Sequence, residues 1–416
     1  MRLISIPAPD DAIVLRSERP GAAMFEGVWR TLLPWPEETI ETAADDWKHA
    51  IAEMERDVPP DAIASDAPFL GGWAGFITYE AMATEEAARP RDAQPPEPPL
   101  FFARHRAGIV IDPRGHAFLF APDGEEHRYL QRLQEHTPQP RNPATPQPSV
   151  NDSLAGDAYK HAVEAIRTAI RDGEVYQVNL TRSFTVDGMY DAALLYRTLT
   201  GTRPPRSAAF VRAPHCTIAS ASPEVLLDFD RVTGVAETRP IKGTIRRGGD
   251  DASEIAALIG SDKDAAEHLM IVDVSRNDLG KVAPPGAVSV PEFRAVRTLE
   301  YVHHLESTVR ATGLGDRSAA DILAALSPAA SITGAPKRAA VAMIRELEPV
   351  PRGVYCGAIG FIGARRVEMS VAIRTAVATA ESVRYHAGGG IVWDSDASAE
   401  DDECRAKAAP FMRFVC

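Results

Sequence analysis

The sequence predicts an α+β protein, in which antiparallel strands and helices occupy separate stretches of the chain. The first observation is a β-meander over residues 353–392, where three strand-like runs are joined by short turns. Strands joined by such turns run antiparallel. The second observation is that apolar residues with helical spacing recur outside the meander. These helical segments are 252–259, 263–279, 318–326, 335–347 and 399–409. A doubly wound fold would instead alternate strands with helices.

The remaining elements follow from the same periodicities. N-terminal strands are expected at 2–6, 13–15, 73–79, 101–111 and 117–120, and N-terminal helices near 41–55 and 126–134. Further along the chain, apolar spacing predicts a helix over 159–171 and a strand over 175–184.

Two proline-rich stretches mark the organisation of the chain. Residues 135–152 mix proline with polar residues and allow no apolar period, so we interpret them as a linker. The linker separates an N-terminal α+β part, 1–134, from a larger part, 153–416. Residues 89–99 are interpreted as a surface loop, because strand-like runs flank them on both sides.

Composition narrows the environment and the partners. The 416 residues include 45 Lys and Arg against 58 Asp and Glu, a net charge of −13, which disfavours nucleic acid as a partner. No apolar run approaches the ~18 residues that span a bilayer, and the N-terminus does not read as a secretory signal. We therefore expect no membrane partner and a cytoplasmic location. The four cysteines form no CxxC pair, which indicates a reducing compartment.

A lysine is the first candidate for chemistry. Lys242 lies in the segment TRPIKGT, between Pro240 and Gly243, which constrain the backbone around it. An unprotonated lysine amine is a nucleophile, and burial or nearby cations favour that form. The simpler alternative is an exposed lysine in a turn.

Two acidic pairs are candidates for a metal site. Asp264 and Glu267 lie three residues apart on a predicted helix, as do Glu400 and Glu403, so each pair shares one helical face. Oxygen ligands from two helices suit a hard cation such as Mg²⁺. Alternatively, the second pair only stabilises the start of its helix through the helix dipole.

Several residues are candidates for holding an anionic small molecule. Arg374 is able to bind a carboxylate through two hydrogen bonds, Lys407 follows Glu403 by four residues, and the glycines 388–390 allow backbone amides to approach a ligand. Strand alternation places His303 and His304 on opposite faces, so one imidazole is available for proton exchange. Each candidate has a structural alternative. Arg374 would be an arginine on a surface strand, and Lys407 an i,i+4 ion-pair partner of Glu403. The glycines 388–390 would form a β-bulge, and the histidine would be hydrogen-bonded in the core.

Taken together, ordered segments of the sequence resemble the chorismate-utilising enzymes over nearly the whole chain. The segments are PFLGGWAGF (68–76), YQVNLT (176–181), SASPEVLL (220–227), PIKGT (240–244), AEHLMIVDVSRNDLGKV (266–282), SITGAPK (331–337), YCGAIGFI (355–362) and GGGIVWDSD (388–396). The resemblance implies two packed antiparallel β-sheets flanked by helices, with a chorismate-binding catalytic domain in residues 153–416.

Two positions distinguish the activities within this family. Members that add water to chorismate carry a lysine where this sequence has Gln177, and the anthranilate type usually has alanine where this sequence has Lys242. The resemblance therefore implies aminodeoxychorismate synthase component I, which converts chorismate and ammonia to 4-amino-4-deoxychorismate for 4-aminobenzoate and folate synthesis. Because no glutaminase signature is found in this chain, the ammonia would come from a separate glutamine amidotransferase subunit or from solution.

The resemblance also implies a role for each matched residue. Lys242 would form a covalent intermediate with chorismate, and His304 would lie near the leaving hydroxyl. Glu267 and Glu403 would bind Mg²⁺ directly, with Asp264 and Glu400 in support. The substrate-binding residues would be Gln177, Thr333, Tyr355, Gly357, Ala358, Arg374, Gly388, Gly389, Gly390 and Lys407.

Three alternatives remain open at this stage. The closest is anthranilate synthase component I. A non-catalytic homologue that only binds chorismate or a partner is the second, and intact Lys242 with both acidic pairs speaks against it. The third is a lysine enzyme that uses pyridoxal phosphate, which would show a cofactor absorption band.

Overall fold

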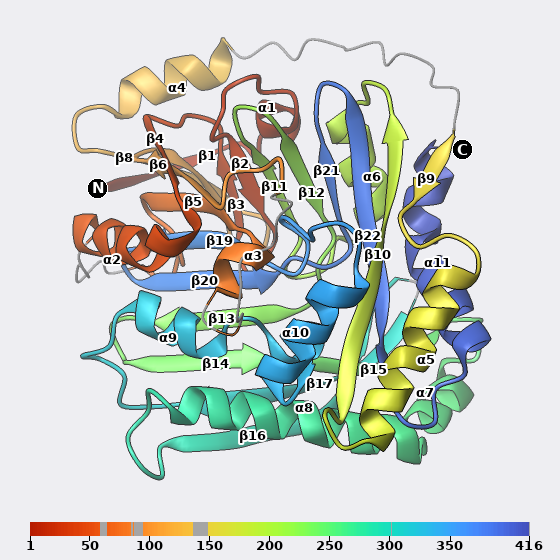
Figure 1. Cartoon of the computed structure of the whole chain (residues 1–416). Coiled ribbons are helices and arrows are strands. Elements are labelled where there is room, and N and C mark those ends of the chain that lie inside the picture. The colour runs from red at the N-terminus through yellow and green to blue at the C-terminus, as the bar shows by residue number, and fades with distance from the viewer. Residues whose placement is uncertain (59–64, 85, 87–94, 136–148, 301, 416) are drawn as a thin grey trace.

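Two antiparallel sheets organise the computed structural model (Figure 1). The structure describes residues 1–58, 65–84, 86, 95–135, 149–300 and 302–415. Within these residues, one sheet has twelve strands in the order β1-β8-β7-β3-β2-β11-β12-β21-β22-β10-β18, with β9 paired to β10. The other has ten strands in the order β15-β17-β14-β13-β20-β19-β5-β6-β4, with β16 paired to β17. The predicted α+β class is confirmed.

Along the chain, runs of consecutive strands belong in turn to one sheet and then to the other. The twelve-stranded sheet contains β1 (Arg2–Ile6), β2 (Ala23–Phe25), β3 (Arg30–Leu33), β7 (Gly108–Ile111), β8 (Ala117–Ala121), β9 (Val150–Asp152), β10 (Gln177–Asp187), β11 (Ala209–Arg212), β12 (Thr217–Ser220), β18 (Gly334–Ala335), β21 (Thr375–Ala378) and β22 (Ser382–Ile391). The ten-stranded sheet contains β4 (Glu38–Thr42), β5 (Gly72–Ile77), β6 (Leu100–His105), β13 (Val225–Asp230), β14 (Val235–Arg239), β15 (Ile241–Arg246), β16 (Val288–Thr298), β17 (Val302–Ala311), β19 (Ala358–Gly363) and β20 (Arg366–Val371).

The sheets pack against each other through an aromatic-rich core. Phe25 of β2 meets Phe361 of β19 edge to face, with ring centroids 5.7 Å apart. Phe69, in the loop before β5, contacts both Phe361 and Phe120 of β8. Such edge-to-face pairs add to the stabilisation that apolar burial provides. This core joins the two sheets face to face, as the family resemblance implied.

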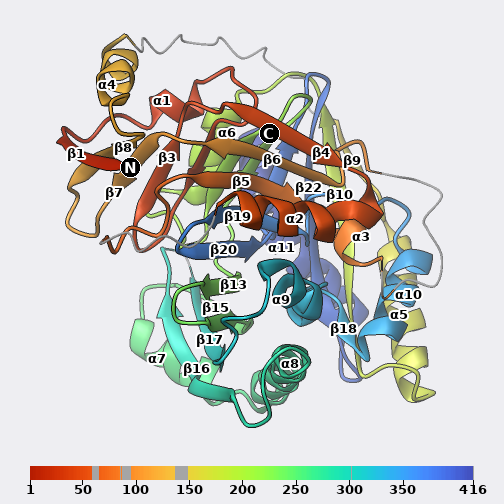
Figure 2. The same cartoon turned by 90° about the vertical axis from the view of Figure 1, so that its left-hand side faces the viewer.

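Helices cover the outer surfaces of the sheets (Figures 1 and 2). The α-helices are α1 (Ala12–Leu15), α2 (Trp47–Asp57), α3 (Tyr79–Met82), α4 (Glu126–Gln134), α5 (Asp157–Arg171), α6 (Ala192–Thr200), α7 (Asp251–Ile259), α8 (Asp262–Gly280), α9 (Ala319–Leu326), α10 (Lys337–Leu347) and α11 (Ala397–Val415). Figure 1 shows α5 and α11 side by side next to β10 and β22, and these helices contact both each other and the strands. Helices α7 and α8 contact β15 and β17 of the other sheet.

Strands from both sides of the predicted linker share the two sheets. The N-terminal 134 residues supply β1–β3, β7 and β8 to one sheet and β4–β6 to the other. Of the predicted linker, 136–148 lie outside the described residues, and its end forms β9. Of the predicted surface loop 89–99, residues 89–94 also lie outside them.

One short N-terminal prediction was wrong, and one predicted helix starts later than expected. Residues 13–15 belong to helix α1 and not to a strand, because the Asp10 carboxylate accepts the Ala12 N–H at 2.8 Å and starts a helical turn. A run of three apolar residues is too short for periodicity to separate the two states. The helix expected over 41–55 begins only at Trp47, since β4 extends to Thr42.

Two longer strand predictions each combined separate strands. The run 101–111 breaks at Arg106 and Ala107 into β6 and β7, which belong to different sheets. The meander likewise divides near Arg374, which has φ +50°. Strands β19 and β20 pair in the ten-stranded sheet, and β21 and β22 pair in the twelve-stranded sheet. The chain therefore crosses between the sheets at Arg374.

A buried ion pair stabilises the region between the sheets. Arg352 Nη2 lies 2.6 Å from Glu348 Oε1, and the guanidinium also donates to Ile332 O and Asn179 O at 2.7 Å. Glu348 in turn accepts the Thr181 N–H at 2.9 Å. We expect Arg352→Met to lower the free energy of unfolding by about 3–5 kcal/mol, because it leaves a buried carboxylate unpaired.

Urea denaturation followed by far-UV circular dichroism measures that change. Arg276→Met is the control, because Arg276 pairs with Asp273 at 3.3 Å on an exposed helix face. It should leave the urea midpoint almost unchanged. Equal midpoint shifts in the two variants would contradict the prediction.

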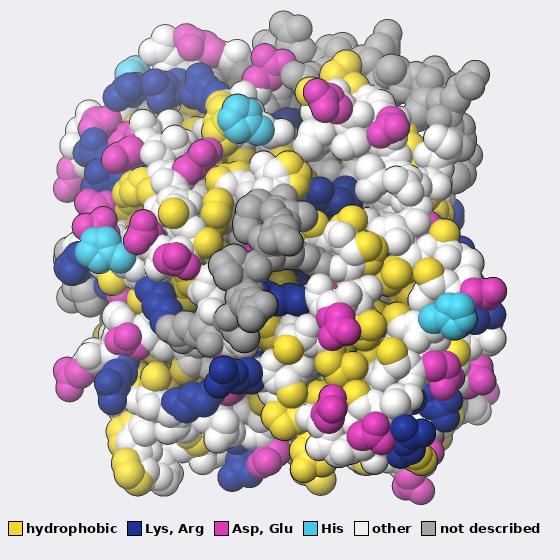
Figure 3. All heavy atoms as spheres, viewed as in Figure 1, with side chains coloured by type: hydrophobic (Ala, Val, Ile, Leu, Met, Phe, Trp, Pro, Cys, Tyr) yellow, Lys and Arg dark blue, Asp and Glu magenta, His cyan; other side chains and the backbone are white. Residues whose placement is uncertain are grey.

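The surface is mixed in charge. On the face drawn in Figure 3, Lys and Arg side chains lie interspersed with Asp and Glu side chains. None of the described helices is both long enough and apolar enough to cross a membrane.

Candidate active site

Lys242 lies on β15, where Pro240 separates this strand from β14. Its Nζ is 2.9 Å from Glu267 Oε2, and its side chain is 17% exposed. Gly243 has φ +86°, and a β-carbon there would approach Asp264 Cβ to 3.2 Å. Glycine at this position therefore lets helix α8 lie close to the lysine strand. Of the predicted site residues, Lys242, Glu267 and Asp264 are brought together.

The glycines of β22 lie on the other side of the site from helix α8. A β-carbon at Gly390 would lie 2.6 Å from Lys242 Nζ and 2.8 Å from Gln177 Nε2. Gln177 is fully buried, and neither atom of its side-chain amide has a hydrogen-bond partner among the described residues. A buried amide without a partner is costly, and a bound ligand would satisfy it.

The second acidic pair lies on the first turns of α11. A β-carbon at Gly389 would lie 3.1 Å from Glu400 Oε2 and 3.8 Å from Glu403 Oε1. Ser395 Oγ donates to Glu400 Oε1 at 2.7 Å. Burial raises the pKa of Glu400, whereas Lys407, with its Nζ 2.7 Å from Glu403 Oε1, lowers the pKa of Glu403.

Lysines balance the charge of these carboxylates. Lys263 Nζ lies 3.9 Å from Glu267 Oε1, and its charge helps to lower the pKa of Glu403 and opposes the rise that burial causes in the pKa of Glu400. The charge of Lys242 also lowers the pKa of Glu403. Helices α8 and α11 therefore present their acidic residues to one positively charged region. An oxygen-only donor set from two helices fits the preference of Mg²⁺.

A cation and a histidine lie on a further side of the site. The Arg374 guanidinium pairs with no carboxylate in the part of the chain that the structure describes. Burial, and then the charges of Arg374 and Arg297, lower the pKa of His304 to about 4. His304 is buried and its Nδ1 has no partner among the described residues. His304 is therefore a neutral imidazole at pH 7, next to an arginine suited to a carboxylate.

The remaining predicted residues lie on the strands and loops near this region. Thr333 is buried, its hydroxyl donates to Ala329 O at 2.8 Å, and its carbonyl accepts the Asn179 N–H at 2.7 Å. Tyr355 stacks on His386 with centroids 5.2 Å apart.

Three of the predicted substrate-binding residues already have partners within the protein. The Gly357 N–H, expected to face substrate, donates to Val354 O at 2.9 Å. Ala358 lies within β19, where it pairs with Ile77 and Val371. Lys407 Nζ donates to Gly388 O at 2.9 Å, which ties α11 to β22.

Glu224 is a candidate residue that the sequence analysis missed. It lies in the SPEVLL segment, is buried, and accepts a hydrogen bond from Ser331 Oγ at 2.5 Å. Burial raises the pKa of Glu224 to about 7, and the charge of Lys242 lowers it in part. A carboxyl group with this pKa is able to donate a proton at neutral pH. An acidic residue directly before an apolar strand was the only signal in the sequence.

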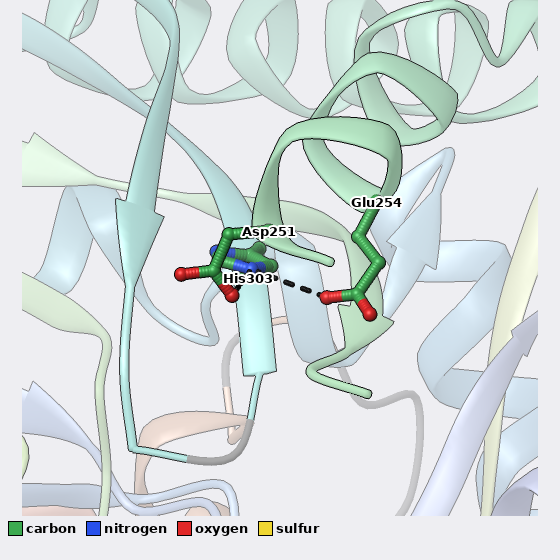
Figure 4. Close-up of side chains that lie close together, drawn as sticks. All are labelled: Asp251, Glu254 and His303. Atoms are coloured by element: carbon green, nitrogen blue, oxygen red, sulfur yellow. Dashed lines mark hydrogen bonds and ion pairs between the residues drawn. The ribbon is translucent and has the colours of Figure 1, made fainter. Parts of the chain in front are cut away.

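A separate cluster lies on the other face of β17 from His304. Figure 4 shows Asp251 and Glu254 of α7 pointing toward His303, whose Nε2 is 3.1 Å from Asp251 Oδ1 and 3.5 Å from Glu254 Oε2. Arg247 donates to both oxygens of Asp251, at 2.9 and 2.7 Å. The cluster is therefore a hydrogen-bonded network that ties α7 to the strand carrying His304.

Comparison with known proteins identifies the class. The family model for chorismate binding enzymes matches residues 12–413. Aminodeoxychorismate synthase component 1 of Klebsiella aerogenes is 37% identical over 81% of this chain and 75% of that protein. Anthranilate synthase component 1 1 of Halobacterium salinarum is 39% identical over 64% of this chain and 52% of that protein. Anthranilate synthase component I from Streptococcus pneumoniae TIGR4 has a similar crystal structure, with TM-score 0.78 and 26% identity over 98% of this chain and 91% of that chain.

The fold and the site define an enzyme that acts on chorismate. The chain belongs to the family of chorismate binding enzymes. Similar proteins carry the names of both amination activities, so the choice between them depends on the site.

Proposed function

We propose that this protein is aminodeoxychorismate synthase component I, which converts chorismate and ammonia to 4-amino-4-deoxychorismate. The observation that carries the proposal is the position of the Lys242 amine. It lies inside the site, next to the backbone of Gly390 and the side-chain amide of Gln177. The anthranilate type usually has alanine at position 242, and the water-adding members have lysine at 177. The product would serve 4-aminobenzoate and folate synthesis in the cytoplasm, with ammonia from a separate glutamine amidotransferase subunit.

In the proposed reaction, Lys242 Nζ forms a bond to C2 of chorismate while the C4–oxygen bond breaks. Glu224 gives its proton to the departing hydroxyl, which leaves as water. Ammonia then bonds to C4, and the bond between C2 and Lys242 breaks, which restores the lysine. Covalent catalysis divides one difficult displacement into two easier ones.

The other residues bind and orient the substrate. Glu267 and Glu403, supported by Asp264 and Glu400, would hold Mg²⁺, which when bound would neutralise a substrate carboxylate. Arg374 would bind a carboxylate through its guanidinium, and the Gln177 amide would gain hydrogen-bond partners. The remaining predicted contacts are with Thr333, Tyr355, Gly357, Ala358, Gly388, Gly389 and Lys407. His304, neutral at pH 7, would accept or donate a hydrogen bond near the leaving hydroxyl.

The pH dependence of the reaction should report the pKa of Glu224. Its protonated form is active as a proton donor, so activity falls as the pH rises through its pKa near 7. The Ser331 hydrogen bond stabilises the charged carboxylate and lowers that pKa. We therefore expect Ser331→Ala to move the alkaline limb of kcat/KM upward by about 0.5–1 pH unit. Ser331→Thr keeps the hydroxyl and should keep the limb in place, whereas an unchanged limb in Ser331→Ala would argue against Glu224 as the donor.

Product identification tests the proposed function. Pure protein is incubated with chorismate, Mg²⁺ and ammonium salt, and the products are separated and identified by mass spectrometry. We expect 4-amino-4-deoxychorismate, without pyruvate. Anthranilate with pyruvate would identify the alternative, anthranilate synthase component I, and absence of turnover would favour a non-catalytic chorismate-binding protein.

A further inference from the structure

Arg182 is a charged residue in the interior of the protein, outside the site described above. It lies on β10 and its side chain is completely buried. Gln177 lies five residues earlier on the same strand, so the two side chains leave opposite faces of the sheet. Gln177 faces Lys242, whereas Arg182 contacts Asp401 of α11 and Tyr159 of α5 on the other side of the sheet.

The guanidinium of Arg182 is held from several directions. Its Nη2 lies 2.6 Å from Asp401 Oδ1, and its Nη1 lies 3.3 Å from Asp152 Oδ2 and 3.1 Å from Leu154 O. The Tyr159 ring lies under it, with the centroid 4.5 Å from Cζ. Burying an arginine is costly, and the Nε of Arg182 has no hydrogen-bond partner among the described residues. The partners of its two Nη atoms nevertheless give the planar guanidinium a defined orientation.

Asp401 connects this guanidinium to the acidic residues of the site. It directly follows Glu400 on α11 and precedes Glu403 by two residues. Successive residues of an α-helix are rotated by about 100° around the axis, so Asp401 points to β10 while the two glutamates point to Gly389. The strand that carries Gly389, β22, is paired with β10, and Arg182 lies opposite Ala387 in that pairing.

The rotation of α11 about its own axis therefore determines where the two glutamates lie. A turn of the helix by a single residue would move both carboxylates away from Gly389. The ion pair between Arg182 and Asp401 opposes that rotation from inside the protein, and the hydrogen bond from Lys407 Nζ to Gly388 O opposes it on the site's side.

We propose that Arg182 is a positioning residue, which acts through Asp401 to place Glu400 and Glu403 for metal binding. The inference rests on the proposed function, in which these glutamates hold Mg²⁺. Arg182 touches neither substrate nor metal, so its effect on the site passes through the orientation of α11.

Asp152 offers a matched control. Its carboxylate also contacts Arg182, and its side chain is 13% exposed, as is that of Asp401. Asp152 lies on β9, however, and not on α11. Arg405 of α11 approaches both carboxylates, at 3.8 Å and 3.2 Å, so loss of that contact is common to the two variants. Asp402, the exposed neighbour of Asp401, controls for the loss of one negative charge near the helix start.

The experiment compares Asp401→Asn, Asp152→Asn and Asp402→Asn in the full chain. Mg²⁺ binding is measured by isothermal titration calorimetry, with and without chorismate, and kcat and KM are measured against Mg²⁺ concentration. Melting temperatures show whether each variant is folded. We expect Asp401→Asn to weaken Mg²⁺ binding roughly 10-fold, while the other two variants keep the wild-type affinity. Arg182→Lys keeps the charge but not the planar fork, and should weaken Mg²⁺ binding as Asp401→Asn does.

The outcomes separate this inference from the proposed function. Equal Mg²⁺ affinity in Asp401→Asn and Asp152→Asn would overturn the positioning role, as would a wild-type protein that binds no Mg²⁺ with chorismate present. If the wild type makes anthranilate while only Asp401→Asn and Arg182→Lys lose Mg²⁺ affinity, the proposed reaction fails and the positioning role stands.

Discussion

Replacing Lys242 with alanine should lower kcat for 4-amino-4-deoxychorismate formation by at least about 1,000-fold. The amine lies 2.9 Å from Glu267 Oε2, and the nitrogen beside it, Gln177 Nε2, belongs to an amide, which is not a nucleophile. Without it, ammonia must displace the C4 hydroxyl without a covalent intermediate. The rate is measured by coupling the product to a lyase that releases 4-aminobenzoate, which is detected by its fluorescence.

Lys263→Ala is the matched control for this variant. Lys263 also approaches Glu267, at 3.9 Å, but its side chain is largely exposed. We expect it to retain most of the activity. If Lys242→Ala and Lys263→Ala reduced the rate by similar factors, Lys242 would act through its charge alone and not as a nucleophile.

Glu224→Gln should lower kcat by about 100- to 10,000-fold, the range typical of a lost proton donor. Glutamine has the shape of the protonated carboxyl group and preserves the contact with Ser331, so the main loss is the transferable proton. The variant should also lose the alkaline limb near pH 7. Rates of ammonia-dependent product formation between pH 6 and 9 measure both effects.

His304→Asn gives the direct comparison, because the family resemblance placed His304 near the leaving hydroxyl. Because the pKa of His304 is about 4, its imidazole is neutral at pH 7 and is a weak proton donor. We expect a smaller loss of kcat than in Glu224→Gln. A larger loss in His304→Asn, with Glu224→Gln still active, would assign proton donation to the histidine.

Sequence patterns predicted the α+β class and most of the elements. Short turns after 362 and before 382 indicated antiparallel strands, and helical spacing located α5, α7, α8 and α10 to within a few residues. The patterns did not show that the chain changes sheets at Arg374. The apolar pattern of the sequence is the same whether the strands on the two sides of Arg374 belong to one sheet or to two. The backbone turn at Arg374, with φ +50°, is visible only in the structure.

Motif residues predicted much of the candidate site, but not its charge state. Lys242, Glu267 and Gly390 come from distant segments, and the structure brings them together. The role we propose for Glu224 depends on the burial that raises its pKa to about 7, and burial follows from packing that no local pattern encodes. Arg182 gave no signal in sequence, since a buried arginine and a surface arginine are indistinguishable without their neighbours.

The central claim is that Lys242 forms a covalent bond with chorismate. The most direct test is intact-protein mass spectrometry after the enzyme has been mixed with chorismate and Mg²⁺ in the absence of ammonia and then acid-quenched. The account predicts a species heavier by chorismate minus one water, located on the peptide that contains Lys242 and absent from Lys242→Ala. A wild-type enzyme that aminates chorismate while only the unmodified mass, or an adduct at another residue, is found would contradict it.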